Sequence, residues 1–245
     1  MERNVTRARG WHAGMAALVA LVLGAALLTV SGSATAINGN RTGPLDNRGF
    51  PRYYRDNAGM SVKLCEDGSA FCLRARRRAL RPPEGEALYW AALAHLRTRR
   101  GPLDVEFALE AAFEGRRPMV ISRLRVRGHL NRRGRYVLHH PYGSLRFRAS
   151  SPREQRNVNV TVDRRCSRVR GGVCALRVDR WLRSTRRHAG YLGTRRRTRV
   201  VGGSVRNTLA LEGRRLGIIG RTPKFRVVGK LCGQKCRARA RRVSR

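Results

Sequence analysis

The sequence predicts an all-β protein of one or two β-sandwich domains that follow a cleaved signal peptide. Three observations support this prediction. Apolar and polar residues alternate in many short runs, Gly-rich and Pro-containing turns separate these runs, and six cysteines fall in three close pairs. Alternation with a period of two places apolar side chains on one face of a strand, and many short strands of this kind are typical of sandwiches.

The first 36 residues have the three parts of a signal peptide. Three arginines precede an apolar run from Ala13 to Val30, and Ala34-Thr35-Ala36 supplies small residues for cleavage. An uncleaved membrane anchor is the alternative, although the run is rich in Ala and Gly and therefore weakly hydrophobic for a spanning helix. Cleavage after Ala36 leaves 209 of the 245 residues, which is enough for a self-supporting core.

The rest of the chain divides by composition. We expect a polar linker at 37–48, a first β-sandwich domain at 49–174, a second and smaller β region at 175–236, and a basic tail at 237–245. The division near 174–187 rests on an arginine-rich stretch that precedes the GYLG motif.

The clearest strand is VEFALEAAFEG, residues 105–115. Val105, Phe107 and Leu109 share one parity, whereas Glu106 and Glu110 share the other. Ala and Glu favour a helix by intrinsic propensity, but a helix would spread the apolar positions around its circumference, so the pattern predicts a strand. The preceding EGEALYWAALAHLRT, residues 84–98, is compatible with a short helix or a strand, and we predict a strand.

The remaining predicted strands follow the same alternation. SLRFRA pairs with RYVLHH as a hairpin around the turn HPYGS. In chain order these strands are 120–128, 135–140, 144–149, 157–164, 175–181, 198–205, 207–213 and 224–231.

The cysteines predict disulfides between sequence neighbours. An even number of cysteines in an exported chain indicates disulfide bonds, and sequential pairing suits hairpin-sized loops best, although six cysteines allow fifteen pairings. A zinc site is the weaker alternative, because the last pair has no second Cys or His pair nearby. The expected pairs are Cys65/Cys72, Cys166/Cys174 and Cys232/Cys236.

Several blocks resemble a family of exported bacterial proteins built from immunoglobulin-like β-sandwich modules, frequent in actinobacteria. The blocks include EALYWAALA, FALEAAFEG, YVLHHPYG, NVNVTVDRRC and GYLG, and they cover most of residues 49–193. This chain departs from the family pattern at Thr194-Arg195, where the family has Asp-Pro, and at many positions that have become arginine. The resemblance implies an immunoglobulin-like architecture and export, and it implies no catalytic residues.

The acidic residues do not predict a catalytic pair. Glu106 and Glu110 would lie about 13 Å apart on one strand, whereas glycosidase carboxylates are about 5 to 9.5 Å apart. We interpret both as a solvated strand face opposite arginines of the next strand. Asp56, Glu66 and Asp67 occur in turn-like sequence, with cation binding as the alternative. Because no nucleophile elbow, zinc motif or P-loop is present, we predict no enzymatic activity, no metal and no cofactor.

His139 and His140 occupy the end of a predicted strand. Successive side chains on a strand point to opposite faces, so the two rings cannot easily hold one metal ion. We expect one ring to be buried and the other to face the arginine surface, with a pH-sensing role as an alternative for either.

The charge is the feature that indicates a function. The formal net charge is +39, and the chain has 54 Lys and Arg residues, of which four are lysines. We expect a polyanion-binding stripe that consists of Arg123, Arg125 and Arg127 on one strand, continued across the hairpin by Arg146 and Arg148. Arginine binds phosphate and carboxylate groups well, and the binding would be non-specific and salt-sensitive.

Outside the cell the available polyanions are envelope polymers, anionic lipids and extracellular DNA. The sequence therefore favours a secreted or envelope-associated binding module. Its alternatives are a secreted hydrolase whose site is assembled from distant residues, and a structural sandwich whose charge reflects GC-rich codons. The oligomeric state is not indicated.

Overall fold

The computed structural model describes residues 41–72, 80–83, 85–166, 178, 180–233 and 236. Residues 37–245 form one compact unit, and every regular element in the described part is a β-strand. The predicted signal peptide and the predicted basic tail lie outside the described residues. The all-β fold class is confirmed, and all strand pairs are antiparallel.

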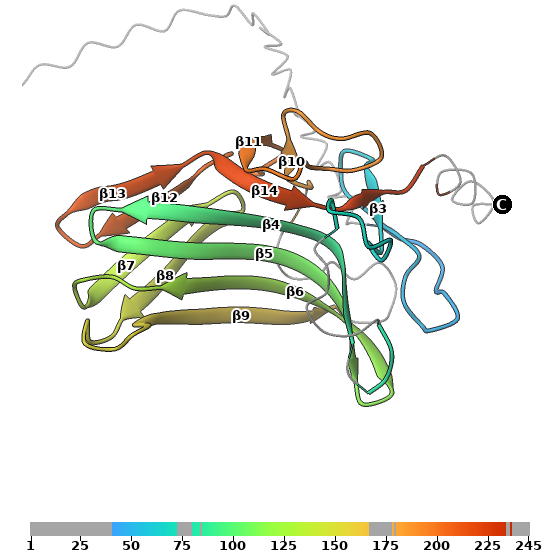
Figure 1. The fold of residues 1–245 in the computed structure, drawn as a ribbon, viewed down its shortest axis with the longest axis horizontal. Helices are drawn as coiled ribbons and strands as arrows, with labels where there is room; N and C mark the ends of the chain where they lie inside the picture. The colour runs from blue at the N-terminus through green and yellow to red at the C-terminus, as the bar shows by residue number, and fades with distance from the viewer. Residues whose placement is uncertain are drawn as a thin grey trace, which may run out of the picture. The chain divides into compact units, whose positions relative to one another are not determined.

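The largest sheet has seven strands, and its centre is a meander. Strands β4 (Glu86–Thr98), β5 (Gly101–Glu114) and β6 (Arg117–Gly128) follow one another along the chain and pair side by side (Figure 1). Strand β9 (Val158–Cys166) pairs with β6 on one side. On the other side β14 (Lys224–Val228) pairs with β4, followed by β11 (Thr198–Val201) and β10 (Arg183–Ser184).

Two smaller sheets complete the fold. One contains β13 (Gly217–Thr222), β12 (Leu209–Gly213), β7 (Gly134–His140) and β8 (Gly143–Ala149), in that order. The other contains β1 (Arg41–Thr42), β2 (Tyr54–Arg55), β3 (Ser61–Lys63) and β15 (Lys230–Leu231).

The core lies between the seven-stranded sheet and the β13-β12-β7-β8 sheet. One face of β5 contributes Val105, Phe107 and Leu109, whereas Tyr136 and Leu138 of β7 and Leu211 of β12 face them, and all belong to one buried apolar cluster. The ring of His140 on β7 lies 5.3 Å from the ring of Phe107, measured between centroids. The two sheets therefore pack face to face. The opposite face of the seven-stranded sheet is partly covered, because Ala91, Ala108 and Val228 form a second buried cluster with Cys65 and Cys72.

The alternating pattern located most strands correctly. Residues 86–98 of the segment 84–98, for which a helix was the alternative, form β4, and the Ala- and Glu-rich segment 105–115 lies largely in β5. The hairpin around residues 141–142 is also confirmed. Strand β13 was not predicted, because Gly-Ile-Ile-Gly has no alternation, and neither were the two- and three-residue strands β1, β2, β3 and β10.

Three predicted strands are wrong in extent. Val178, Arg180 and Trp181 are not in a strand, because the backbone N–H of Trp181 donates to the carboxylate of Asp56 at 2.9 Å; the rest of 175–181 lies outside the described residues. The strand at 198–205 ends at Val201, since Gly202 has a φ of 103°. The strand at 224–231 is divided at Gly229 between two sheets.

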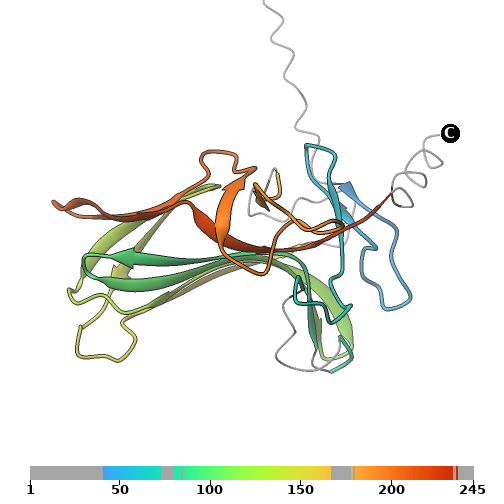
Figure 2. The ribbon, with the colours of Figure 1, turned by 45° about the horizontal axis from the view of Figure 1, so that its top comes forward.

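Strands from residues 175–236, the expected second β region, join the same sheets as strands of the first region. Strand β14 pairs with β4, and β12 pairs with β7. Figure 2 shows the red C-terminal strands running alongside the green strands β4 and β5. The expected linker at 37–48 contributes β1, which pairs with β2.

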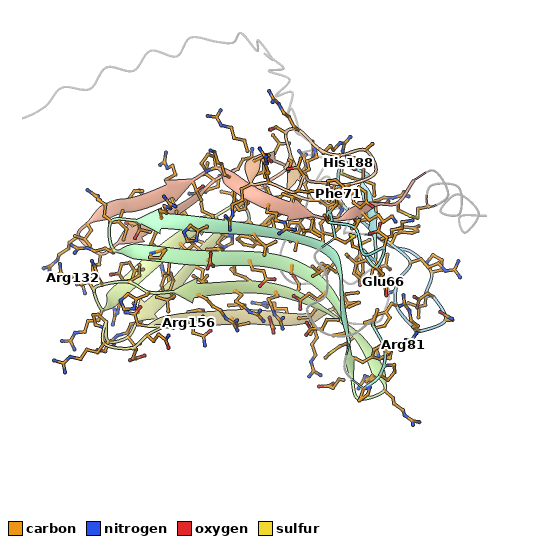
Figure 3. The ribbon with its side chains drawn as sticks, in the orientation of Figure 1. Glu66, Phe71, Arg81, Arg132, Arg156 and His188 are labelled. Atoms are coloured by element: carbon orange, nitrogen blue, oxygen red, sulfur yellow. A yellow bond between two sulfur atoms is a disulfide. The ribbon has the colours of Figure 1, made fainter. Side chains whose placement is uncertain are left out.

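Two of the expected disulfides are present, Cys65–Cys72 and Cys232–Cys236. Cys174, the expected partner of Cys166, lies outside the described residues. The loop closed by Cys65 and Cys72 is held by stacking, because the Phe71 ring lies parallel to the His188 ring with 4.1 Å between their centroids. Figure 3 labels both residues, which lie near each other in that view. Disulfides persist in oxidising compartments, so the two bridges indicate an extracellular-type environment.

Candidate functional site: an arginine-lined groove

The outer face of the β13-β12-β7-β8 sheet presents polar side chains in three rows across the strands. The register places Ser144 of β8 opposite His139 of β7, and Arg146 opposite Val137. It also places Arg148 opposite Arg135. Strand β12 extends the middle row with Glu212, which lies opposite Val137. Arg214, in the turn after β12, extends the last row, because its backbone N–H donates to the carbonyl of Arg135 at 3.4 Å.

The middle and last of these rows line an open groove of about 570 Å³. Its charged lining residues are Arg135, Arg146, Arg148, Arg214 and Glu212. All four arginines are exposed, and within the described part of the chain none of their guanidinium groups forms an ion pair. Like charges directly opposite each other on a sheet repel, so an anion between Arg135 and Arg148 would relieve an unfavourable contact.

Next to the groove, the lining residue Glu212 belongs to a connected set of neutral and acidic groups. The Nδ1 atom of His139 lies 3.1 Å from the hydroxyl of Ser144, and its Nε2 atom lies 2.7 Å from a carboxylate oxygen of Glu212. His140 points the other way and is buried, and its Nδ1 atom accepts a hydrogen bond from the backbone N–H of Tyr142. The expectation that the two rings occupy opposite faces, one buried and one on an arginine surface, is confirmed.

The predicted arginine stripe is divided between two sheets. Arg123, Arg125 and Arg127 share the outer face of β6, whereas Arg146 and Arg148 lie on β8 in the other sheet. The five residues therefore do not form one surface. Arg135 and Arg214, which the prediction missed, complete the groove, because register and the β12–β13 turn bring them beside Arg148.

The arginines of β6 already have partners. Arg123 donates to Asp163 through Nε at 2.8 Å and to Glu110 through Nη1 at 2.7 Å, and its side chain is 12% exposed. Arg125 pairs with Glu106 at 3.4 Å, and Arg127 donates to the amide oxygen of Asn159. The acidic residues predicted to face cross-strand arginines do so, and they neutralise this face.

Glu110 corrects the prediction of a fully solvated strand face. Its side chain is 6% exposed, and burial raises its pKa to about 7. Arg123 lowers the pKa only in part, since its guanidinium is shared with Asp163. Sequence parity placed Glu110 on the outer face but could not show that this part of the face is covered.

The titration of Glu110 predicts a specific pH dependence of stability. Between about pH 4.5 and 7 the folded carboxyl is protonated and the unfolded one is ionised, so stability falls as the pH rises. The pKa of His140, lowered to about 4 by burial, acts oppositely between about pH 4 and 6.5. We expect the unfolding free energy of Glu110→Gln, relative to wild type, to increase by about 3 kcal/mol from pH 4.5 to 7. Urea denaturation at half-unit pH steps measures this difference, and a pH-independent difference would contradict it.

The other acidic candidates stabilise loops. Asp56 accepts hydrogen bonds from the backbone N–H groups of Met60 and Trp181, and Glu66 pairs with Arg48. Asp67 accepts from Tyr191 and Lys230, each at 2.6 Å, and these contacts lower its pKa. Across the described residues, no group of three His, Cys, Asp or Glu side chains is placed to hold a metal ion.

No protein-family model, no curated protein and no solved structure matches this chain. Within the described part of the chain, none of the elements is a helix of the length and apolar character needed to cross a membrane.

Proposed function

We propose that this protein is an exported, immunoglobulin-like β-sandwich module of the cell envelope or the extracellular space. It binds anionic polymers non-enzymatically through the arginine-lined groove. The observation that carries the proposal is the convergence of four exposed, unpaired guanidinium groups on one groove. The signal-peptide pattern and the resemblance of the sequence blocks to exported bacterial proteins support the location.

The contrast between the two sheet faces supports the groove over the rest of the charged surface. On β6, Arg123 and Arg125 form ion pairs with carboxylates of β5 and β9, which neutralise their positive charge. In the groove the guanidinium groups of Arg146 and Arg148 retain their capacity for bidentate contacts with phosphate, sulfate or carboxylate groups. Other arginines are scattered, for example Arg81 and Arg132 at opposite ends of Figure 3, so they add long-range attraction without forming a site.

Binding to a sulfated or phosphorylated polymer is expected to weaken steeply with salt. Each neutralised anionic group releases condensed counterions, so four arginines give a slope of about −3 to −4 in log K against log salt. Titration of a fluorescent heparin fragment between 50 and 300 mM NaCl measures this slope. Absence of binding at the lowest salt concentration defeats the proposal.

A secreted hydrolase is the second candidate, because His139 connects Ser144 to Glu212. In that mechanism His139 takes the proton of the Ser144 hydroxyl as it attacks an ester carbonyl, and Glu212 stabilises the imidazolium. His139 then gives the proton to the departing alcohol as the ester C–O bond breaks, and water hydrolyses the acyl-enzyme. We rank it second because Ser144 and His139 are direct cross-strand neighbours, so register alone explains their hydrogen bond. Labelling of Ser144 by a fluorophosphonate probe, lost in Ser144→Ala, would reverse the ranking.

A further inference from the structure

We infer that the ligand of the groove is an anionic carbohydrate polymer, in which hydroxyl-bearing sugar units carry phosphate, sulfate or carboxylate groups. This inference rests on the proposed function and specifies its ligand class. It follows from Glu212, which lies among the arginines of the groove lining, and from His139 and Ser144, which adjoin the groove and connect to Glu212.

The decisive feature is a carboxylate inside an otherwise cationic groove. Glu212 repels an anion bound at Arg146 or Arg214, so it weakens binding to a polymer that carries charge at every unit. A ligand with hydroxyl groups at this position would instead donate hydrogen bonds to the carboxylate, and such charge-assisted hydrogen bonds are among the stronger ones. One Glu212 oxygen is oriented by His139 Nε2 at 2.7 Å, so the acceptor is held in place.

The spacing of the rows fits alternating neutral and charged groups. Along a strand, residues on one face recur about every 7 Å. The row with His139 and Ser144 is therefore about 7 Å from Arg146 and about 13 Å from the pair Arg148 and Arg135. A sugar unit near His139 would place anionic substituents of its own or neighbouring units at these arginines.

The groove could contact the phosphates of a nucleic acid but has no exposed aromatic ring on which its bases could stack. Non-specific binders of single strands stack bases on aromatic side chains, but the two aromatic residues in the groove lining belong to the buried core. Tyr136 is 3% exposed and Phe147 is 8% exposed, and their rings stack against each other at 5.9 Å. No base can reach either ring face in this arrangement.

A lipid surface also fits the groove less well than a carbohydrate polymer, because the groove lining lacks large exposed apolar side chains. Insertion into a bilayer interface needs exposed apolar side chains beside the basic ones. In the described residues the large exposed apolar side chains are Leu45, Val205 and Ile218, and none of them lines the groove.

The test compares two polyanions, one with sugar hydroxyls and one without. Dextran sulfate and inorganic polyphosphate are titrated against full-length mature protein at one salt concentration. Replacement of Glu212 by Gln is expected to strengthen polyphosphate binding, because a repulsive charge is removed, and to weaken dextran sulfate binding. We expect the ratio of the two affinities to shift about tenfold toward polyphosphate. His139→Gln, which releases the carboxylate from its orientation, is expected to shift the ratio in the same direction.

Controls separate this inference from the proposed function. Glu86→Gln removes the same charge from an exposed position on β4 and should leave the ratio unchanged. A ratio unchanged in both groove variants overturns the carbohydrate assignment while polyanion binding stands. Tighter binding of duplex DNA or phosphatidylglycerol vesicles than of dextran sulfate overturns it in favour of those partners. Failure of every probe to bind at low salt overturns the proposed function itself.

Discussion

Replacement of Arg146 and Arg148 by glutamate is expected to reduce the affinity for dextran sulfate or heparin at least 100-fold at 100 mM NaCl. Both side chains are exposed on the edge strand β8 and line the groove. The double variant removes two phosphate- or sulfate-binding groups and adds two repulsive charges, each change contributing about 1 kcal/mol or more. The fold should remain intact, because neither side chain forms an ion pair in the described residues.

A charge-matched double variant controls for the effect of net charge on the affinity. Arg52→Glu with Arg116→Glu changes the total charge by the same amount at exposed positions outside the groove. We expect this control to lower the affinity only a few-fold, through the long-range field. Equal losses in the two double variants would mean that the charge acts as a diffuse surface property and that the groove is not a site.

Trp181→Ala is expected to destabilise the protein by about 3–5 kcal/mol, the largest effect of any single substitution considered. The indole of Trp181 is 1% exposed and lies 5.6 Å from the Trp90 ring. Its Nε1–H donates to the carbonyl of Met60 at 3.0 Å. Truncation creates a cavity and removes one of the two hydrogen bonds that the Met60 carbonyl accepts, the other coming from the backbone N–H of Asp56.

This substitution also tests how the chain is divided. Trp181 lies in the expected second β region, but its partners Met60 and Trp90 lie in the first. Chemical denaturation followed by fluorescence and by circular dichroism should therefore show one transition, shifted as a whole to lower denaturant concentration. Trp181→Phe, which keeps an aromatic ring and loses the hydrogen bond, should shift it less. Two transitions, of which only one moves, would show two separately folding domains.

The sequence was sufficient for the strands whose two faces differ in polarity. In β5 the burial of Val105, Phe107 and Leu109 overrides the helix propensity of the Ala and Glu residues between them. The same alternation correctly placed His139 and His140 on opposite faces of their strand. These predictions succeed because the side-chain period of a strand is a local property.

The site was less predictable, because it depends on which strands become neighbours. The arginines of β6 and β8 have the same local pattern, yet carboxylates on the flanking strands β5 and β9 pair with Arg123 and Arg125 of β6. Strand β8 lies at a sheet edge beside β7, which contributes Arg135 to the groove. Arg214 reaches the groove through a hairpin whose second strand, β13, has no alternating pattern. The burial of Glu110 likewise depends on tertiary contacts, which the local sequence pattern does not show.

The most direct test of the account is the salt dependence of polymer binding in the groove variant. Log K for dextran sulfate is measured against log salt for wild type, for Arg146→Glu with Arg148→Glu, and for Arg52→Glu with Arg116→Glu. If the groove holds the polymer, the groove variant loses about two or more units of slope, whereas the control keeps a slope close to that of the wild type. A slope that is the same in all three proteins would contradict the central claim that this groove is the binding site.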